Sequence, residues 1–326
     1  MNLQNILILA PLAGYTDVPF RSVVKDFGAD LTVSEMISSH ALAFKNVRTQ
    51  KMLEKAPNET PYSVQVSGST PQIMVRAIER LNLEKGIDIV DFNCGCPAPK
   101  VANHGNGSAL LKDLNLLVAM LRLIKEHSNA PHTSVKVRIG FDRKIPEEIA
   151  HALNDTDVDF VVVHGRTRAD GYKKDKIDYD SIARMKKILK KPIIANGEID
   201  CPKKANEVRE QTGADGLMIG RAALQAPWIF TMIKNDVEIS GEQEVALRYQ
   251  IAHKHLEKMV DFYGQRGVII YRKNLHNYAK GLQGASEFRC KVNRIEDFNE
   301  MRAAIEEFFA PLLQNIKEMQ WFKSSI

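Results

Sequence analysis

Short runs of apolar and β-branched residues recur along the first two thirds of the chain, separated by segments of helical character. Eight such runs predict strands, at residues 6–10, 31–34, 62–66, 87–92, 134–138, 160–164, 192–195 and 216–220. They are almost continuously apolar, which is typical of parallel strands that are covered on both faces. Strands that alternate with helices in this way predict a parallel sheet joined by crossover helices.

The intervening segments predict helices at residues 16–27, 71–81, 108–125, 146–153, 179–189 and 202–211. Eight parallel strands with crossover helices indicate an α/β fold, a closed (β/α)₈ TIM barrel, which commonly takes about 250 residues. An open doubly wound sheet is the alternative, because a count of strands does not show closure.

Strand signals stop after Trp228. Residues 242–260 and 295–313 carry apolar residues at three-to-four spacing, which predicts amphipathic helices that pack together. Charged and turn residues make 234–244 a reasonable linker. We therefore expect two domains, a barrel over residues 1–240 and a small all-helical domain over residues 241–326.

Composition narrows the class of protein. Among the 326 residues, 44% are hydrophobic and 26% charged, which is ordinary for a folded globular protein. A net charge of +5 does not by itself imply a polyanionic partner. Four cysteines without a C-x-x-C pair fit a reducing compartment, so we expect a cytoplasmic protein. The apolar run 6–13 is too short to span a bilayer, and we expect no membrane partner and a monomer.

In an α/β barrel the active site lies where the strands' carboxyl ends meet the following loops. Those positions are polar or glycine-rich here: Pro11 to Gly14, Glu35, Gln65, Asn93, Cys94 and Cys96, Lys136 and Arg138, His164 to Arg166, Asn196 to Glu198, and Gly220 with Arg221. Each alone has an ordinary explanation as a turn or a solvated side chain. Their occurrence at all eight strand ends predicts a site.

Two of these loops, "ANGEI" at 195–199 and "MIGRAA" at 218–223, have features that bind phosphate. Glycines let backbone amides approach an anion, and Arg221 adds a fork of donors. Two ordinary βα turns are the alternative. A phosphate there suits flavin mononucleotide (FMN), with Gln65 at the pyrimidine edge of the ring and Lys136 beside N1 and O2. A Schiff base on Lys136 is the competing chemistry, and it would leave Cys96 without a role.

The loop "NCGCPAPKVANHGNG" places a cysteine before a proline and a run of glycines. Pro97 disfavours helix at Cys96, so the loop can present that thiol over the mouth of the barrel. A thiol of ordinary pKa, about 8.5, is protonated near neutral pH and can donate a proton. A nucleophilic role needs a base, and only His104 lies nearby. C-x-C lacks a usual zinc spacing, so we expect no metal, and Cys94 is expected to be structural.

Four segments together resemble the tRNA-dihydrouridine synthases, a flavin-dependent family, over essentially the whole chain. They are "APLAGYTDVPFR" (10–21), "NCGCPAPKV" (93–101), "HGRTR" (164–168) and "ANGEI" (195–199). Leu12 stands where the family usually has Met, and Glu198 where it has Asp. "GRAALQAPWIF" (220–230) is similar to a bacterial branch.

The resemblance implies an enzyme that reduces uridine in tRNA to 5,6-dihydrouridine, with NADPH recharging FMN. Hydride passes from flavin N5 to uracil C6, and the Cys96 thiol protonates C5. Asn93 helps to position the base or the loop. FMN contacts are implied for Pro11, Leu12, Ala13, Gln65, Lys136, His164, Asn196, Gly197, Glu198, Gly220 and Arg221.

The helical region carries a basic stretch that favours RNA binding. Between 266 and 294 lie Arg266, Arg272, Lys273, Lys280, Arg289, Lys291 and Arg294 against only Glu287, with Tyr271, His276 and Tyr278 interleaved. With the resemblance, the stretch implies tRNA contacts from Arg272 and Lys273. A solvated face is the ordinary alternative. Two other functions stay open, namely a flavin dehydrogenase of a free pyrimidine such as dihydroorotate, and a tRNA-binding protein without activity.

Overall fold

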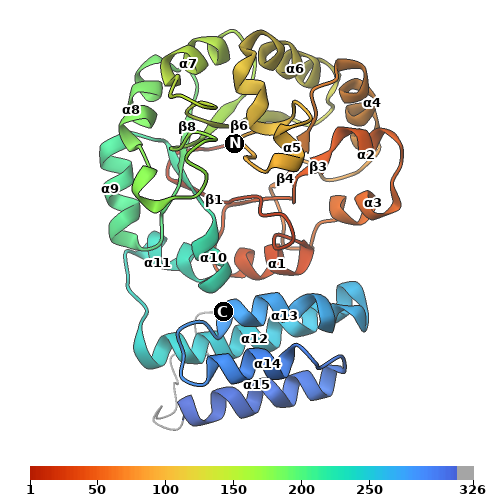
Figure 1. Ribbon diagram of the computed structural model, residues 1–326, viewed down its shortest axis with the longest axis vertical. Coiled ribbons are helices and arrows are strands. Elements are labelled where there is room, and N and C mark those ends of the chain that lie inside the picture. The colour runs from red at the N-terminus through yellow and green to blue at the C-terminus, as the bar shows by residue number, and fades with distance from the viewer. Residues whose placement is uncertain (314–326) are drawn as a thin grey trace.

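The computed structural model describes residues 1–313, so the last part of the predicted domain 241–326 lies outside the described residues. Figure 1 shows a ring of strands surrounded by helices, with the C-terminal helices below it. Among the described residues, no helix is long and apolar enough to cross a membrane.

Eight parallel strands form the closed barrel that the sequence predicts. They are β1 (Ile6–Leu9), β2 (Leu31–Val33), β4 (Tyr62–Ser67), β5 (Ile89–Cys94), β6 (His132–Arg138), β7 (Phe160–His164), β8 (Ile193–Asn196) and β9 (Gly216–Ile219). The ring closes because β1 pairs with both β2 and β9, and β2 pairs with β4. This closure excludes the doubly wound sheet. A short strand β3 (Ile37–Ser38) adds a further pairing with the end of β4.

The inside of the barrel is apolar at its floor and polar at its mouth, the end where the strands' carboxyl termini lie. Alternate strand residues point inward and form one apolar cluster of Ile6, Ile8, Ala10, Leu31, Val33, Ile89, Phe160, Val162, Ile194 and Met218. The residues between them pack outward against the helices. The same alternation, continued along β4, β5 and β6, brings Gln65, Asn93 and Lys136 to the inner side at the mouth.

The predicted crossover helices form, with one correction. They are α1 (Val18–Asp26), α4 (Pro71–Leu81), α6 (Leu114–His127), α7 (Pro146–Asn154), α8 (Tyr179–Ile188) and α9 (Pro202–Thr212). The prediction of a single helix over 108–125 is wrong, because a 3-10 helix, η1 (Gly107–Lys112), precedes α6. Asp113 separates them, since its carboxylate accepts a hydrogen bond from the Leu116 amide at 3.0 Å and caps α6.

Short helices occupy several loops that the hydrophobic pattern leaves unassigned. They are α2 (Ser39–Ala43), α3 (Val47–Leu53), α5 (Pro99–Ala102), the 3-10 helix η2 (Lys174–Lys176), α10 (Arg221–Gln225) and α11 (Ile229–Asn235). The linker predicted at 234–244 is shorter than expected, because α11 ends at Asn235 and the next helix begins at Gly241.

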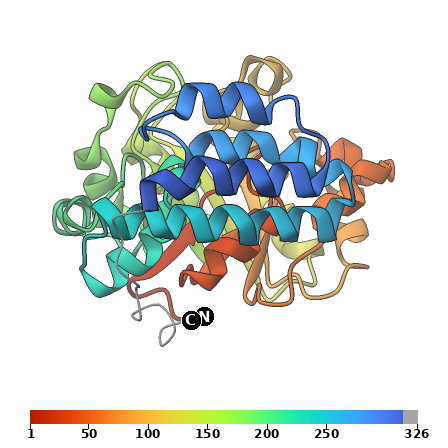
Figure 2. The same cartoon turned by 90° about the horizontal axis from the view of Figure 1, so that it is seen from below.

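Four C-terminal helices form a second layer with its own apolar core, seen from below in Figure 2. They are α12 (Gly241–Tyr263), α13 (Arg266–Tyr278), α14 (Ala285–Val292) and α15 (Phe298–Leu313). Their core takes in Val23 of α1 and Trp228 from the barrel side. The layer is therefore packed onto the barrel through apolar side chains.

Charged side chains join the same two layers. Lys254 and Lys258 of α12 lie 3.0 and 3.8 Å from a carboxylate oxygen of Asp26 at the end of α1. Lys51 of α3 donates to the Phe262 carbonyl at 2.9 Å. The C-terminal helices are thus held against helices that follow the first two barrel strands.

Candidate active site

Polar side chains from neighbouring strands form a connected chain of hydrogen bonds inside the mouth. Asn93 Nδ2 donates to Gln65 Oε1 at 2.7 Å, and Gln65 Nε2 donates to Asp91 Oδ2 at 2.7 Å. Ser134 donates to the other Asp91 oxygen at 2.6 Å. Gln65 and Asn93 thus have fixed amide orientations before any ligand binds.

Asp91 is a member of this chain that the sequence analysis missed. Its carboxyl is buried, and burial raises its pKa while the Ser134 and Gln65 hydrogen bonds oppose that rise. The sequence signal that could have found it is a charged residue inside an apolar strand run. Asp91 is two residues from both Ile89 and Asn93, so all three face the inside of the barrel.

Lys136, near the carboxyl end of β6, brings a positive charge to the mouth. Its Nζ donates to Asn196 Oδ1 at 2.9 Å, and Asn196 Nδ2 donates to the Met218 carbonyl at 2.8 Å. Burial, followed by the nearby Arg138 charge, lowers the pKa of Lys136 to about 8, while Asp91 opposes the shift. The ammonium therefore predominates at neutral pH and loses its proton at mildly alkaline pH.

His164 is a neutral member of the site. It is 8% exposed, and burial together with the surrounding cations, Lys136 first, holds its pKa well below the ordinary value. Arg166 NH1 lies 3.1 Å from His164 Nε2, so the neutral ring accepts that hydrogen bond and keeps its Nδ1 proton.

The predicted phosphate loops meet in a charged cluster. Glu198 Oε1 accepts from Arg166 NH2 at 2.8 Å and also from Arg221. Gly197 has φ of +128°, which side chains rarely adopt, and a Cβ there would also lie 2.4 Å from the Ile177 Cδ1 methyl, so this turn favours glycine. Glu198, for which the resemblance implies an FMN contact, therefore holds two guanidinium groups beside the glycine turns.

An exposed aromatic ring stands over the same rim. Tyr172, in the loop after β7, is 57% exposed. The Arg138 and Arg221 guanidinium carbons lie 5.4 and 5.5 Å from its ring centroid. These distances are within the range of cation–π attraction, so Tyr172 is oriented by two arginines from β6 and α10.

The loop after β1 borders the mouth and contains Pro11, Leu12 and Ala13. The Leu12 amide donates to Thr16 Oγ1 at 3.0 Å, and the Gly14 amide donates to Glu35. None of the three residues is buried, which leaves their backbone available to a flat ligand.

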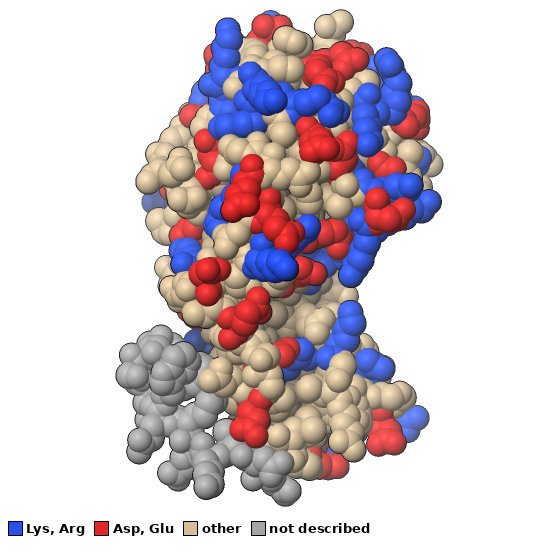
Figure 3. Space-filling view, turned by 90° about the vertical axis from the view of Figure 1, so that its left-hand side faces the viewer, with Lys and Arg blue, Asp and Glu red and all other residues tan. Residues whose placement is uncertain are grey.

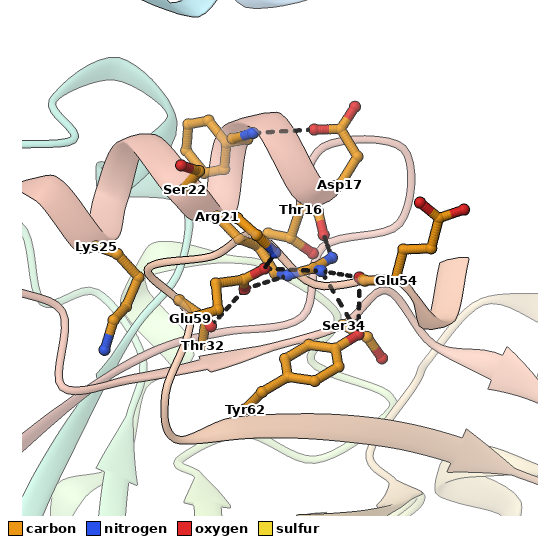
Figure 4. A network of polar contacts seen from close by, with 12 residues as sticks. Thr16, Asp17, Arg21, Ser22, Lys25, Thr32, Ser34, Glu54, Glu59 and Tyr62 are labelled. Atoms are coloured by element: carbon orange, nitrogen blue, oxygen red, sulfur yellow. Dashed lines mark hydrogen bonds and ion pairs between the residues drawn. The ribbon is translucent and has the colours of Figure 1, made fainter. Parts of the chain in front are cut away.

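A buried ion pair fixes this loop from beneath, as Figure 4 shows. Arg21 Nε donates to Glu59 Oε1 at 2.7 Å, and Arg21 NH1 donates to the Thr16 carbonyl at 2.9 Å. Thr32 of β2 also donates to Glu59, at 2.7 Å. Removing one partner of such a pair costs about 3–5 kcal/mol, so Arg21, the end of the "PFR" segment, has a structural role that the sequence analysis did not assign.

Cys94 and Cys96 of the C-x-C segment have different surroundings. Cys94 lies within the outer apolar core, and burial raises the pKa of its thiol. Cys96 is only half-buried. Gly107 packs against it, since a Cβ at that residue would lie 3.1 Å from Cys96 Cβ. The Cys96 amide donates to Asn93 Oδ1 at 3.0 Å, so this half-buried residue lies beside the polar chain of the mouth.

The basic residues of the C-terminal helices have different surroundings. Arg272 NH2 donates to the Ile295 carbonyl at 2.8 Å, so this side chain ties α13 to the segment before α15. Lys273 instead reaches the barrel, with Nζ 5.4 Å from the ring centroid of Tyr15 in the loop after β1. Tyr271 and Tyr278 are buried in the helical core and cannot form part of an RNA-binding face.

The surface between the two layers is hollowed. Figure 3 shows this hollow at the right of the view, with Lys and Arg side chains above and below it. Lys273 bridges from α13 to the loop after β1, which itself borders the mouth. Positive charge from the C-terminal helices therefore lies beside the polar site.

Fold and site together define a (β/α)₈-barrel enzyme with its active site at the carboxyl ends of the strands. A family model described as dihydrouridine synthase (Dus) matches residues 8–316. The chain belongs to this family.

Individual relatives agree. A "Probable tRNA-dihydrouridine synthase" of Helicobacter pylori (strain J99 / ATCC 700824) is 61% identical over 93% of this chain and 92% of the relative. The "tRNA-dihydrouridine synthase B" of Pseudomonas syringae pv. tomato is 41% identical over 97% of this chain and 96% of the relative.

Solved structures share the barrel fold. A crystal structure of TcOYE with pHBA has a TM-score of 0.56 at 8% identity, covering 79% of this chain and 94% of that one. Morphinone reductase in complex with tetrahydroNAD has a TM-score of 0.52 at 12% identity, covering 72% and 88%. At these identities the likeness concerns the fold alone.

Proposed function

We propose that this protein is a cytoplasmic, FMN-dependent enzyme that reduces specific uridines of tRNA to 5,6-dihydrouridine with NADPH as the reductant. The observation that carries the proposal is the meeting, in one barrel mouth, of a half-buried thiol at Cys96 with a preorganised polar set of Gln65, Asn93 and Lys136. The names of the relatives support tRNA as the substrate.

The donor set of the mouth fits FMN. Beyond its bonds to Asp91 and Asn93, the Gln65 amide has a second N–H and a second lone pair, which would suit the pyrimidine edge of the flavin ring. Lys136 carries positive charge suited to the N1 and O2 side of that ring. The ribityl chain and phosphate would be held by His164, Asn196, Gly197, Glu198, Gly220 and Arg221, and the ring would be flanked by Pro11, Leu12 and Ala13. Bound reduced FMN would supply a hydride from N5 to uracil C6.

Cys96 would act on the opposite face of the base. Its S–H bond breaks as a C5–H bond forms, and water then returns a proton to the thiolate. A positioned general acid contributes about 10²- to 10⁴-fold to a rate. Asn93 is proposed to hold the loop of Cys96, because its Oδ1 accepts a hydrogen bond from the Cys96 amide at 3.0 Å. It is also proposed to border the base.

The target uridine must leave the stacked tRNA to reach this mouth. We therefore propose that the two domains bind different molecules. Residues 1–240 bind FMN and perform catalysis, and residues 241–326 bind the tRNA backbone. Lys273 is the better placed of the two proposed contacts, since Arg272 already donates to the Ile295 carbonyl. Phosphate contacts of this kind give affinity that falls with salt.

The test uses the purified full-length chain and tRNA from cells that lack dihydrouridine. We expect a yellow protein that NADPH bleaches, and dihydrouridine in the tRNA on mass spectrometry of its nucleosides. Free uracil and orotate serve as controls and should not reoxidise the flavin. Turnover of either free pyrimidine but not of tRNA would support the small-molecule dehydrogenase instead. A colourless protein that binds tRNA would overturn the enzymatic proposal.

A further inference from the structure

The two peptide units that flank Cys96 are each held by side chains from elsewhere in the mouth. The Gly95 carbonyl accepts from Arg138 Nε at 2.8 Å, and the Cys96 amide of the same peptide donates to Asn93 Oδ1 at 3.0 Å. The Cys96 carbonyl accepts from the Ser108 hydroxyl at 2.8 Å and from the Ser108 amide at 3.2 Å. Because each peptide unit is planar, these bonds fix the Cα–Cβ direction of Cys96.

Arg138 is the member of this set that links two loops. It stands at the carboxyl end of β6 and is 1% exposed. Besides Gly95, its guanidinium donates to the Thr167 carbonyl at 2.7 Å and to the Gly171 carbonyl at 2.9 Å, both in the loop after β7. A planar guanidinium directs several hydrogen bonds at fixed angles, which an ammonium does not.

The loop after β5 is packed closely around Cys96. Gly107 has φ of +59°, and an added Cβ would lie 3.1 Å from both the Cβ and the carbonyl oxygen of Cys96. Gly95 packs against β6, with 3.5 Å between an added Cβ and the Lys136 carbonyl oxygen. The Cys96 backbone thus has neighbours on both sides, tightly at Gly107 and in ordinary contact at β6, and the Arg138 bond sets the orientation of the Gly95–Cys96 peptide between them.

We propose that Arg138 is a positioning residue for the Cys96 thiol, acting through the Gly95–Cys96 peptide. The inference rests on the proposed function, in which Cys96 delivers a proton to the base. Displacement of a reacting group by about 1 Å can cost about 100-fold in rate. Arg138 should therefore affect the step that consumes uridine and leave the reduction of flavin by NADPH unaffected.

The test is Arg138→Lys, which keeps a positive charge but loses the directed fork, followed in anaerobic single-turnover experiments. We expect flavin reduction by NADPH within about twofold of wild type, and reoxidation by saturating tRNA slowed by about 30- to 100-fold. The matched control is Arg248→Lys, since Arg248 is also buried, at 4% exposed, and donates to the Tyr278 and Lys280 carbonyls in the C-terminal helices. Its reoxidation rate at saturating tRNA should stay within about twofold.

A double-mutant cycle shows whether Arg138 acts through Cys96. In a Cys96→Ala background, Arg138→Lys should cause no further slowing of reoxidation. Additive losses would show that Arg138 acts elsewhere and would overturn the inference. If Cys96→Ala slows reoxidation while Arg138→Lys does not, the inference fails and the proposed function stands. If Cys96→Ala itself is as fast as wild type, the proposed function fails first.

A second readout needs neither flavin nor tRNA. Alkylation of the flavin-free protein by iodoacetamide, followed at each cysteine peptide by mass spectrometry, should change at least about threefold at Cys96 in Arg138→Lys. Cys201 and Cys290 are internal controls and should react as in wild type. Ser108→Ala, which keeps the Ser108 amide bond, should show smaller effects of the same kind if Arg138→Lys folds poorly. Unchanged Cys96 reactivity in both variants would contradict the positioning role.

Discussion

The barrel mouth and the C-terminal helices both contain many arginine, lysine and aromatic residues. In the mouth the polar side chains gather at a candidate site, whereas in the helices they bond to neighbouring helices. In the mouth, Asn93 donates to Gln65 and Lys136 donates to Asn196, so side chains from neighbouring strand ends hold one another in place. In the helices, Arg248 donates to backbone carbonyls at the end of α13, and His255 lies 2.8 Å from the Tyr278 hydroxyl. Polar groups there hold the helices together.

The difference has a geometric origin. The carboxyl ends of parallel strands meet at one edge, so polar residues at strand ends converge whatever else the chain does. On a helix, only the three-to-four period decides which residues face the core. Charge in a helical stretch therefore indicates a binding face only after the inward-facing residues have been set aside.

The largest expected effect on the reduction of the flavin is in the mouth, at Lys136. In Lys136→Met the side chain keeps its approximate length and loses its charge, so reduction of the bound flavin by NADPH should slow by about 10²- to 10³-fold, as on loss of one preorganised electrostatic donor. Stopped-flow measurement of flavin bleaching gives the rate. Lys125→Met is the control, because Lys125 lies on α6 and pairs with Asp159 away from the mouth, and it should reduce normally. Equal rates in the two variants would remove the electrostatic role of Lys136.

A smaller effect is expected at Asp17, where the two regions meet. Its carboxyl caps α1 through the Phe20 amide and accepts from the Tyr263 hydroxyl of α12 at 3.3 Å. Burial raises the pKa of Asp17 to about 6, partly opposed by the Phe20 hydrogen bond and Lys273 and assisted by Glu35. Between about pH 4 and pH 6 the native carboxyl binds a proton that the unfolded chain has released, so its contribution to stability is lost as pH rises.

Asp17→Asn keeps a capping oxygen and removes the ionisation. Relative to wild type, it should therefore become more stable on going from pH 4 to pH 7, by about 1–3 kcal/mol. Urea unfolding of both proteins at the two pH values measures the difference. A stability difference that does not change with pH would show that Asp17 ionises freely.

The smallest expected effect is a difference in tRNA binding between variants of Lys273 and Arg272, which are adjacent on α13. Lys273→Glu should weaken tRNA binding about tenfold and flatten its salt dependence, because it removes a free charge beside the mouth. Arg272→Glu should weaken binding less and should lower stability by about 1–3 kcal/mol, since the Ile295 carbonyl loses its donor. Binding titrations at two salt concentrations and urea unfolding distinguish them. The reverse order of the binding effects would place the RNA-binding face on the other side of α13.

Much of the fold could be predicted from the sequence because its strands are continuous apolar runs. The eight strands and their order follow from that pattern, whereas closure does not, since the pairing of β1 with β9 joins runs 210 residues apart. The helix predicted over 108–125 failed because Asp113 makes a cap within a favourable apolar stretch. A helix cap depends on one polar side chain, so the spacing of apolar residues does not predict where the cap lies.

Most residues of the candidate site could be predicted from the sequence, but the hydrogen bonds between them could not. Lys136 and Asn196 were both expected in the mouth, whereas their hydrogen bond depends on the radius of the barrel. Asp91 and the bonds from Arg138 to the loops were missed, although their charge within apolar strand runs was a usable signal. Tyr271 and Tyr278 were assigned to an RNA-binding face from composition, and the spacing of 268, 271, 275 and 278 would have placed them in the core.

The central claim is that the thiol of Cys96 delivers a proton to a base held in the mouth. The direct measurement compares Cys96→Ala with Cys94→Ala, each reduced anaerobically by NADPH and mixed with tRNA lacking dihydrouridine. Both should bind and reduce flavin; reoxidation should slow by about 10²- to 10⁴-fold in Cys96→Ala and by less than about threefold in Cys94→Ala. Equal reoxidation rates in the two variants would contradict the account.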